Sequence, residues 1–191
     1  MTYEDLIKKY PLLFENSQDS NSPFAHFGFE CNDGWYDIID GLCKSLYRNY
    51  RITNQRLEFV ESSLKDLDKY IQYRKDLTKE QALQNLEKEK SALLVELEEA
   101  KRGVPIVSQI KEKFGTLRFY VDFREGVSAC STSRVYALVD FAEHMTELTC
   151  EVCGNKGETY EMGWHKTLCP THAMNKYGVE KVAEYHKAKN E

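Results

Sequence analysis

The sequence predicts an α+β protein with three parts: a compact core of helices and one β-hairpin, a protruding antiparallel helical hairpin of coiled-coil type, and a small cysteine-rich C-terminal module. A charged block with heptad-like apolar spacing, two short alternating segments, and clustered cysteines near the C-terminus predict this arrangement. We divide the chain into an N-terminal helical part of the core (1–53), the hairpin insertion (54–102), the β-hairpin and helix that complete the core (103–148), and the C-terminal module (149–191).

Composition and charge place the protein among soluble globular chains. Of its 191 residues, 41% are apolar and 30% are charged, which is typical of a folded protein and not of a disordered one. The net charge is −5, and the halves on either side of Gly103 are both mildly acidic. Bulk charge therefore does not attract nucleic acid or an anionic membrane surface.

The sequence contains no membrane or export signal. No segment approaches the roughly 20 apolar residues that span a bilayer, and the start Met1–Asp5 lacks the basic and apolar regions of a signal peptide. We therefore expect a cytoplasmic protein without a membrane partner. In that reducing compartment, three isolated cysteines are interpreted as small core hydrophobes: Cys31, Cys43 and Cys130.

The N-terminal part contains the strongest core helix. A short helix is expected from Thr2 to Tyr10, and the aromatic stretch Phe24–Glu30 is expected to be a strand or an extended segment. Asn32 or Asp33 then caps a helix whose apolar residues fall on one stripe. That stripe consists of Trp35, Ile38, Ile39, Leu42, Cys43, Leu46 and Tyr50.

The block from Asn54 to Arg102 predicts two antiparallel helices and not one rod. Thr78 and Gln81 have the spacing of a capping box, which starts a new helix inside the periodic region. The seam of the first helix would contain Leu57, Val60, Leu64, Leu67 and Ile71, and that of the second Leu83, Leu86, Leu93, Leu97 and Ala100. The charged faces are expected to be solvated, and the apolar seam could equally serve a homodimer.

Beyond Gly103 the periodicity changes from helix to strand. Two strands are expected at Ile106–Glu112 and Thr116–Phe123, followed by helices at Ser133–Glu147 and Val179–Lys189. In the second strand, one face holds Leu117, Phe119, Val121 and Phe123.

Cys150 and Cys153, then Cys169 and His172, have the spacing of a structural zinc site. The order is C-x2-C, fifteen intervening residues, and C-x2-H. Four such ligands close a tetrahedral site without an open position, so zinc is expected to stabilise a zinc-ribbon-like module and not to activate water. His165 is the rival fourth ligand; His172 is preferred because it reproduces the x2 turn.

The segments Cys150–Gly154 and Leu168–His172 resemble the zinc-framing part of HNH and endonuclease VII-like nucleases. Those families place a catalytic Asp-His pair between the two ligand pairs to hold a second metal. Here the intervening segment has only His165 and is shorter than those folds need. Nuclease activity is therefore the least favoured alternative, and no catalytic residue is predicted.

Two other segments carry chemistry that the sequence leaves open. Glu30–Trp35 places a thiol beside carboxylates, and His26 or His144 would have to act as its base; capping and core packing are the preferred interpretation. Lys111–Tyr120 interleaves lysines with aromatic residues, as in surfaces that bind single-stranded nucleic acid. Because alternation points Phe119 inward and leaves little exposed aromatic surface, a nucleic-acid-binding zinc module is the runner-up to a protein-binding role.

Three blocks together resemble a family of small uncharacterised proteins encoded by bacteriophages and prophages. They are Phe27–Trp35, Ile110–Tyr120 and the cysteine pairs, in this order, and residues 54–102 fall outside the resemblance. The resemblance implies a phage or prophage source and the cytoplasm of a host cell, and it supplies no activity. We therefore expect a non-catalytic zinc-binding interaction protein that engages a host or phage protein, with inhibition of a host defence system as one form of that role.

Overall fold

The alternating segments beyond Gly103 form an antiparallel hairpin at the centre of the molecule. In the computed structural model, which describes residues 2–74 and 76–189, β2 (Ile106–Lys113) pairs with β3 (Thr116–Asp122). A two-residue strand, β1 (Phe29–Glu30), adds to β2 in parallel, so the sheet has the order β1-β2-β3. The predicted α+β class is confirmed.

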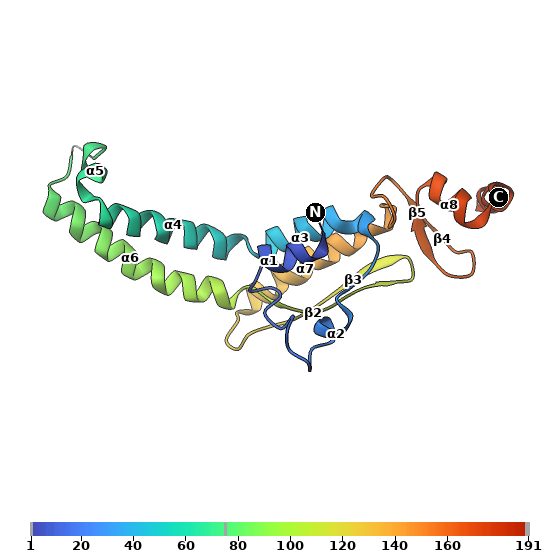
Figure 1. Ribbon diagram of the computed structural model, residues 1–191, viewed down its shortest axis with the longest axis horizontal. Helices are drawn as coiled ribbons and strands as arrows, with labels where there is room; N and C mark the ends of the chain where they lie inside the picture. The colour runs from blue at the N-terminus through green and yellow to red at the C-terminus, as the bar shows by residue number, and fades with distance from the viewer. Residues whose placement is uncertain (1, 75, 190–191) are drawn as a thin grey trace.

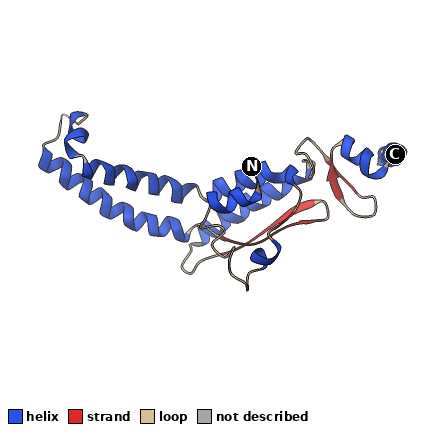
Figure 2. Ribbon diagram, viewed as in Figure 1, coloured by secondary structure: helices blue, strands red, loops and turns tan. Residues whose placement is uncertain are grey.

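Helices cover one side of this sheet and bury its apolar face. The helices are α1 (Tyr3–Lys9), α3 (Tyr36–Leu46) and α7 (Ala129–Glu147), and α7 packs against both α3 and β3 (Figures 1 and 2). The predicted apolar stripe faces the core, with Ile38 and Tyr50 only partly buried. The helix is shorter than predicted, because α3 ends at Leu46 and Tyr50 lies beyond it. The largest buried side chains of the core include Trp35, Phe14, Leu6, Leu13, Ile39, Ile110 and Leu117.

The aromatic stretch from Phe24 to Glu30 is only partly extended. Pro23 starts a short helix, α2 (Pro23–Phe27), because a proline at the first helical position loses no hydrogen bond. Gly28, at φ 58°, follows that helix, and β1 comes next. The expectation of a single strand or extended segment is therefore wrong for the helical residues.

The start of α3 also differs from the prediction. A 3-10 turn, η1 (Asp33–Trp35), precedes the helix, and neither Asn32 nor Asp33 caps α3. The side-chain amide of Asn32 instead donates a hydrogen bond of 2.9 Å to Glu151. A partner more than a hundred positions away thus replaces the local capping interaction.

The charged block forms an antiparallel helical hairpin that projects from the core (Figure 1). It contains α4 (Arg48–Lys65), α5 (Leu67–Gln72) and α6 (Lys79–Arg102), and α4 packs along α6. The capping box of Thr78 and Gln81 is present. The hairpin starts at Arg48, before the predicted Asn54, and its description as a coiled coil stays a prediction.

The seam between α4 and α6 contains Leu57, Val60, Leu86 and Leu93 as predicted. Leu83, by contrast, is 40% exposed, and Ala82 is buried in its place. The reason is helical periodicity: position 82 lies one turn before Leu86 on the same face, whereas position 83 is rotated by about 100°.

The C-terminal module has a small core of its own at the opposite end of the molecule from the hairpin (Figure 1). It contains β4 (Glu158–Tyr160), β5 (Lys166–Leu168), α8 (Pro170–Tyr177) and the predicted last helix, α9 (Val179–Lys189). Its buried apolar residues are Cys150, Tyr160, Leu168, Cys169, Ala173 and Val182.

The module docks on the core through a close backbone contact at Gly34. The Gly34 N–H donates to the carbonyl of Glu151 at 2.9 Å, and the indole N–H of Trp35 donates to the carbonyl of Thr149 at 2.8 Å. A β-carbon on residue 34 would lie 2.7 Å from the backbone nitrogen of Cys153. Only glycine permits this approach.

No helix in the described ranges 2–74 and 76–189 is both long enough and apolar enough to span a membrane.

Gly34→Ala should separate the module from the core, whereas Gly41→Ala should not. The new methyl group at position 34 meets backbone atoms, so we expect a loss of about 3 kcal/mol in the free energy of unfolding. Gly41 lies exposed within α3 with open space around it, and alanine there should add up to about 1 kcal/mol. Urea unfolding of both variants measures the difference; equal stabilities would contradict the contact.

Candidate metal centre

Two structural elements bring the four predicted ligands together. Cys150 and Cys153 lie on a tight turn that follows α7, closed by a hydrogen bond of 2.9 Å from the Gly154 N–H to the Cys150 carbonyl. Cys169 is the residue before α8, and His172 lies in the first turn of that helix. The second ligand pair therefore sits at a helix start, unlike the first, because Pro170 begins a helix directly after Cys169.

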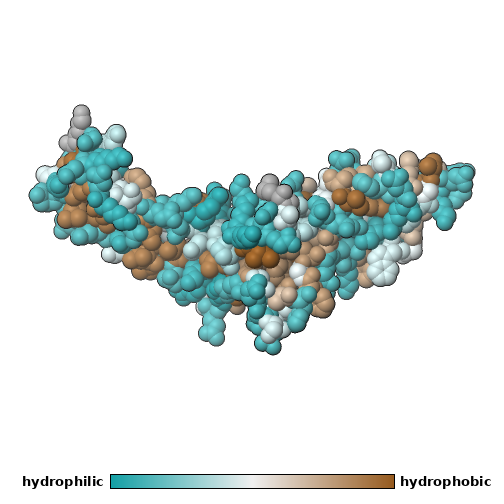
Figure 3. Space-filling model, in the orientation of Figure 1, coloured by the Kyte–Doolittle hydropathy of each residue, from teal (hydrophilic) through white to brown (hydrophobic). Residues whose placement is uncertain are grey.

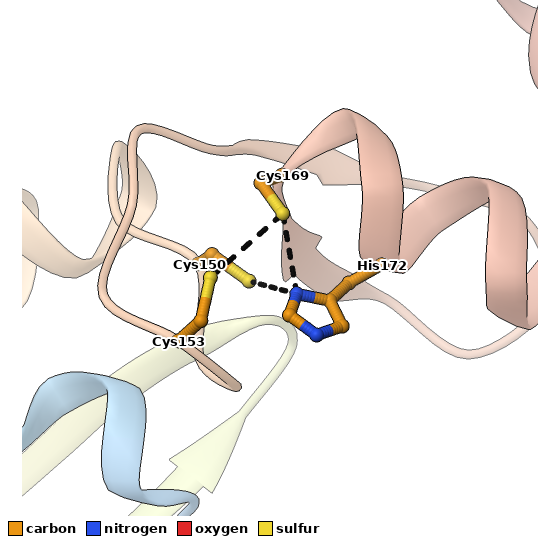
Figure 4. A group of neighbouring side chains, drawn as sticks. All are labelled: Cys150, Cys153, Cys169 and His172. Carbon is orange, nitrogen blue, oxygen red and sulfur yellow. Dashed lines mark hydrogen bonds between the residues drawn. The ribbon is translucent and has the colours of Figure 1, made fainter.

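The four ligand atoms converge on one point (Figure 4). They all lie within 4.8 Å of one another. Cys153 Sγ and Cys169 Sγ are 3.8 Å apart, and His172 Nδ1 lies 3.4 Å from Cys150 Sγ and 3.2 Å from Cys169 Sγ.

These separations match the edges of a tetrahedron around a metal ion. Metal–sulfur bonds of about 2.3 Å and metal–nitrogen bonds of about 2.05 Å give edges of about 3.8 Å between sulfurs and about 3.6 Å from sulfur to nitrogen. A disulfide would require sulfurs about 2.05 Å apart, and all three cysteines are free. The arrangement is therefore that of a four-ligand site able to hold a metal ion.

Backbone N–H groups and neighbouring sulfur atoms shift the pKa of two of the thiols. Burial raises the pKa of Cys169, but hydrogen bonds from the backbone N–H groups of His172 and Thr171, together with hydrogen bonds to the sulfurs of Cys153 and Cys150, lower it overall. A backbone hydrogen bond from Asn155 lowers the pKa of Cys153, yet burial and the neighbouring sulfur of Cys150 raise it overall. A bound cation would offset the repulsion between adjacent thiolates.

His172, and not His165, is the histidine that the structure places with the three cysteines. The His165 ring lies 6.0 Å from the ring of Phe114, in an edge contact. Within the described ranges, this is the one group of three or more metal-ligating side chains.

The thiol at Cys31 lacks the features of a nucleophile. Burial raises its pKa to about 11, so the thiol is neutral near pH 7. Both histidines considered as its base are engaged elsewhere: His26 contacts the Ser20 carbonyl at 2.6 Å, and His144 pairs with Glu147 at 3.2 Å. This supports the interpretation of Cys31 as a packing residue.

An ion network beside the metal site was not predicted from the sequence. Glu151 lies within the ligand turn and is buried, and Lys166 Nζ lies 2.9 Å from both Glu151 and Glu112. Burial alone would lower the pKa of Lys166, but its hydrogen bonds to the two carboxylates raise it. The position of Glu151 between two predicted metal ligands is the one feature of the sequence that could have pointed to this network.

The same region holds the turn of the β2–β3 hairpin against the module. The Thr167 hydroxyl donates to the Gly115 carbonyl at 2.6 Å, and the Gly115 N–H donates to Glu112 at 2.7 Å. Glu112 thus links the hairpin turn to Lys166, and through it to the ligand turn. The metal site, β-hairpin and N-terminal segment meet around one buried ion network.

Comparison with protein-family models, curated proteins and solved structures finds no match to this chain.

Lys166→Met should destabilise the protein by about 2–4 kcal/mol, because it leaves two carboxylates without their shared cation. Lys156→Met is the matched control: it is an exposed lysine of the same module, and its loss should change the free energy of unfolding by less than about 0.5 kcal/mol. Chemical denaturation measures both. Equal effects of the two substitutions would show that the network contributes nothing.

Cysteine labelling should report metal binding residue by residue. In metal-loaded protein we expect a thiol reagent to label exposed Cys130 rapidly, and buried Cys43 slowly because burial raises its pKa. After a chelator is added, Cys150, Cys153 and Cys169 should label as well. Mass spectrometry of the digested protein identifies the sites, and unchanged labelling of these three would contradict the metal centre.

Proposed function

We propose that this protein is a non-catalytic zinc-binding interaction protein that engages a protein partner through the far end of its helical hairpin. Zinc is the metal because three thiolates and one imidazole at tetrahedral spacing are its preferred ligands. A closed set of four protein ligands leaves no position for a reactive water. The metal therefore has a structural role, which is to hold the ligand turn against α8.

The observation that carries this proposal is an exposed aromatic cluster at the far end of the hairpin. Phe59 is 63% exposed and Tyr73 is 80% exposed, although both are large apolar side chains. Together with Tyr70, Lys69 and Arg74 they line a cleft of about 410 Å³. In Figure 3, hydrophobic residues interrupt the hydrophilic surface of the hairpin.

Packing within the hairpin does not account for these aromatic side chains. The buried residues of the seam are aliphatic and Tyr70 packs against them, whereas Phe59 and Tyr73 remain in solvent. The Arg74 guanidinium lies 5.9 Å from the Tyr70 ring centre, which keeps the charge beside the aromatic surface. Tyrosine, phenylalanine and arginine around a cleft are the residues that dominate binding at protein interfaces.

The resemblance to phage and prophage proteins supports a host or phage protein as the partner. The hairpin lies outside the blocks that carry the resemblance, as an appendage on a shared core would. An exposed pair of helices offers a long narrow surface for contacts with another helix. Inhibition of a host defence system is one form that such a contact would take.

The double variant Phe59→Ser/Tyr73→Ser should abolish partner recovery while leaving the fold intact. Affinity capture from host cells, with and without phage infection, compares it with the native protein and with Tyr136→Ser/Phe141→Ser, whose exposed rings lie on α7. We expect at least a tenfold loss for the hairpin variant alone, since interface aromatics contribute about 2 kcal/mol or more each.

Two outcomes would contradict this proposal. Recovery of the same proteins by the native protein and the hairpin variant would exclude the aromatic cluster as the binding surface. If light scattering shows a stable homodimer for the native protein and a monomer for the hairpin variant, the cluster serves self-association instead.

A further inference from the structure

We propose that the turn of the β2–β3 hairpin, together with the adjacent loop of the module, forms a binding surface for single-stranded nucleic acid. This turn surface comprises Lys111, Lys113, Phe114, Tyr120, Trp164 and His165. It is separate from the helical hairpin, at the other side of the core, and does not depend on the proposed protein partner.

The turn holds an aromatic side chain at a position where the fold favours glycine or asparagine. Phe114 and Gly115 form the two-residue connection between paired Lys113 and Thr116, with φ values of 56° and 80°. Such turns prefer Asn-Gly because both residues need positive φ. Phe114 is the one non-glycine residue with positive φ in the part of the chain that the structure describes.

The fold gains little from this phenylalanine. Its side chain is 61% exposed, and its packing partners are the edge of the His165 ring and the Lys113 ammonium group, 5.4 Å from the ring centre. Meanwhile Gly115 is tied to Thr167 and Glu112 by hydrogen bonds, so the ring stands on a rigid support. An aromatic ring held in solvent at a strained position is explained by a ligand that stacks on it.

Further exposed aromatic side chains lie in the same part of the molecule. Tyr120 projects from β3 on the sheet face that carries Lys111, whose Nζ lies 5.4 Å from the Tyr120 ring centre. Trp164 precedes His165 in the chain and is 74% exposed. Phe119, in contrast, faces the core as predicted, so the exposed aromatic surface consists of Phe114, Tyr120 and Trp164.

Two lysines of the turn surface lack a carboxylate partner although the chain is acidic. Neither Lys111 nor Lys113 forms an ion pair with a carboxylate of the described residues, and Lys111 Nζ instead donates to the amide oxygen of Gln109 at 2.7 Å. The nearby carboxylate of Glu112 pairs with Lys166, which it shares with Glu151, and Glu30 accepts a hydrogen bond from Gln109. The two lysines are therefore free to contact phosphates.

Lysines beside exposed rings match the chemistry of a single strand. Unpaired bases stack on aromatic side chains with little sequence preference, while phosphates contact the cations. A duplex hides the faces of its bases, so it would use only the lysines. A short single strand of DNA or RNA is the ligand that engages both kinds of side chain.

The test uses fluorescence anisotropy of labelled twelve-nucleotide oligo(dT) and oligo(U) with the full-length native protein. Phe114→Asn should reduce affinity about tenfold, as for other stacked bases, while the unfolding midpoint stays equal or rises because asparagine tolerates positive φ. Phe141→Ala, which removes an equally exposed ring on α7, should leave affinity unchanged.

The double variant Lys111→Gln/Lys113→Gln tests the phosphate contacts. It should reduce the slope of log K against log salt by about 1.4.

Further controls decide whether the rings stack on bases. An abasic oligomer of equal length should bind about tenfold more weakly, and emission from exposed Trp164 should be quenched by oligo(dT) while buried Trp35 is unaffected. The proposal would be overturned if the abasic oligomer or a duplex bound as tightly as the single strand. It would also be overturned if poly-glutamate of equal charge displaced the single strand. No binding at 20 mM salt would also overturn it. The variant Phe59→Ser/Tyr73→Ser must retain binding, which separates this inference from the function proposed for the hairpin.

Discussion

The contact between the Gly34 segment and the ligand turn is the interaction on which the arrangement of the molecule depends. Gly34 and Trp35 bond to the backbone between Thr149 and Glu151, and Glu151 lies between two metal ligands. One turn thus supplies two of the four candidate metal ligands and also contacts the core. Ordering of the turn by a metal ion is therefore coupled to the position of the whole C-terminal module.

A second contact makes this docking rigid. Lys166 joins the carboxylates of Glu112 and Glu151, so the β-hairpin and the ligand turn share one cation. The segments Phe27–Trp35, Ile110–Tyr120 and Cys150–His172 meet here, although they are far apart in the chain. Their common feature is physical: each supplies a residue to the joint between core and module. The helical hairpin supplies none and projects from the other side of the core.

The molecule exposes aromatic side chains in two separate places, each against a local cost. At the far end of the hairpin, Phe59 and Tyr73 stand in water beside a cleft. At the β2–β3 turn, Phe114 is exposed and has an unfavourable backbone conformation. Neither set is required to fill a core, because the three apolar clusters are complete without them. Binding is the role that we propose for these rings.

The sequence by itself determined the features that arise from local spacing. The capping box at Thr78, the α4–α6 seam, the alternation of β2 and β3, and the C-x2-C and C-x2-H pairs were predictable because each depends on residues within a few turns of one another. Only the tertiary structure decided that Asn32 bonds Glu151 and that Lys166 joins two carboxylates. These outcomes depend on partners that are distant in the chain, which no local pattern encodes.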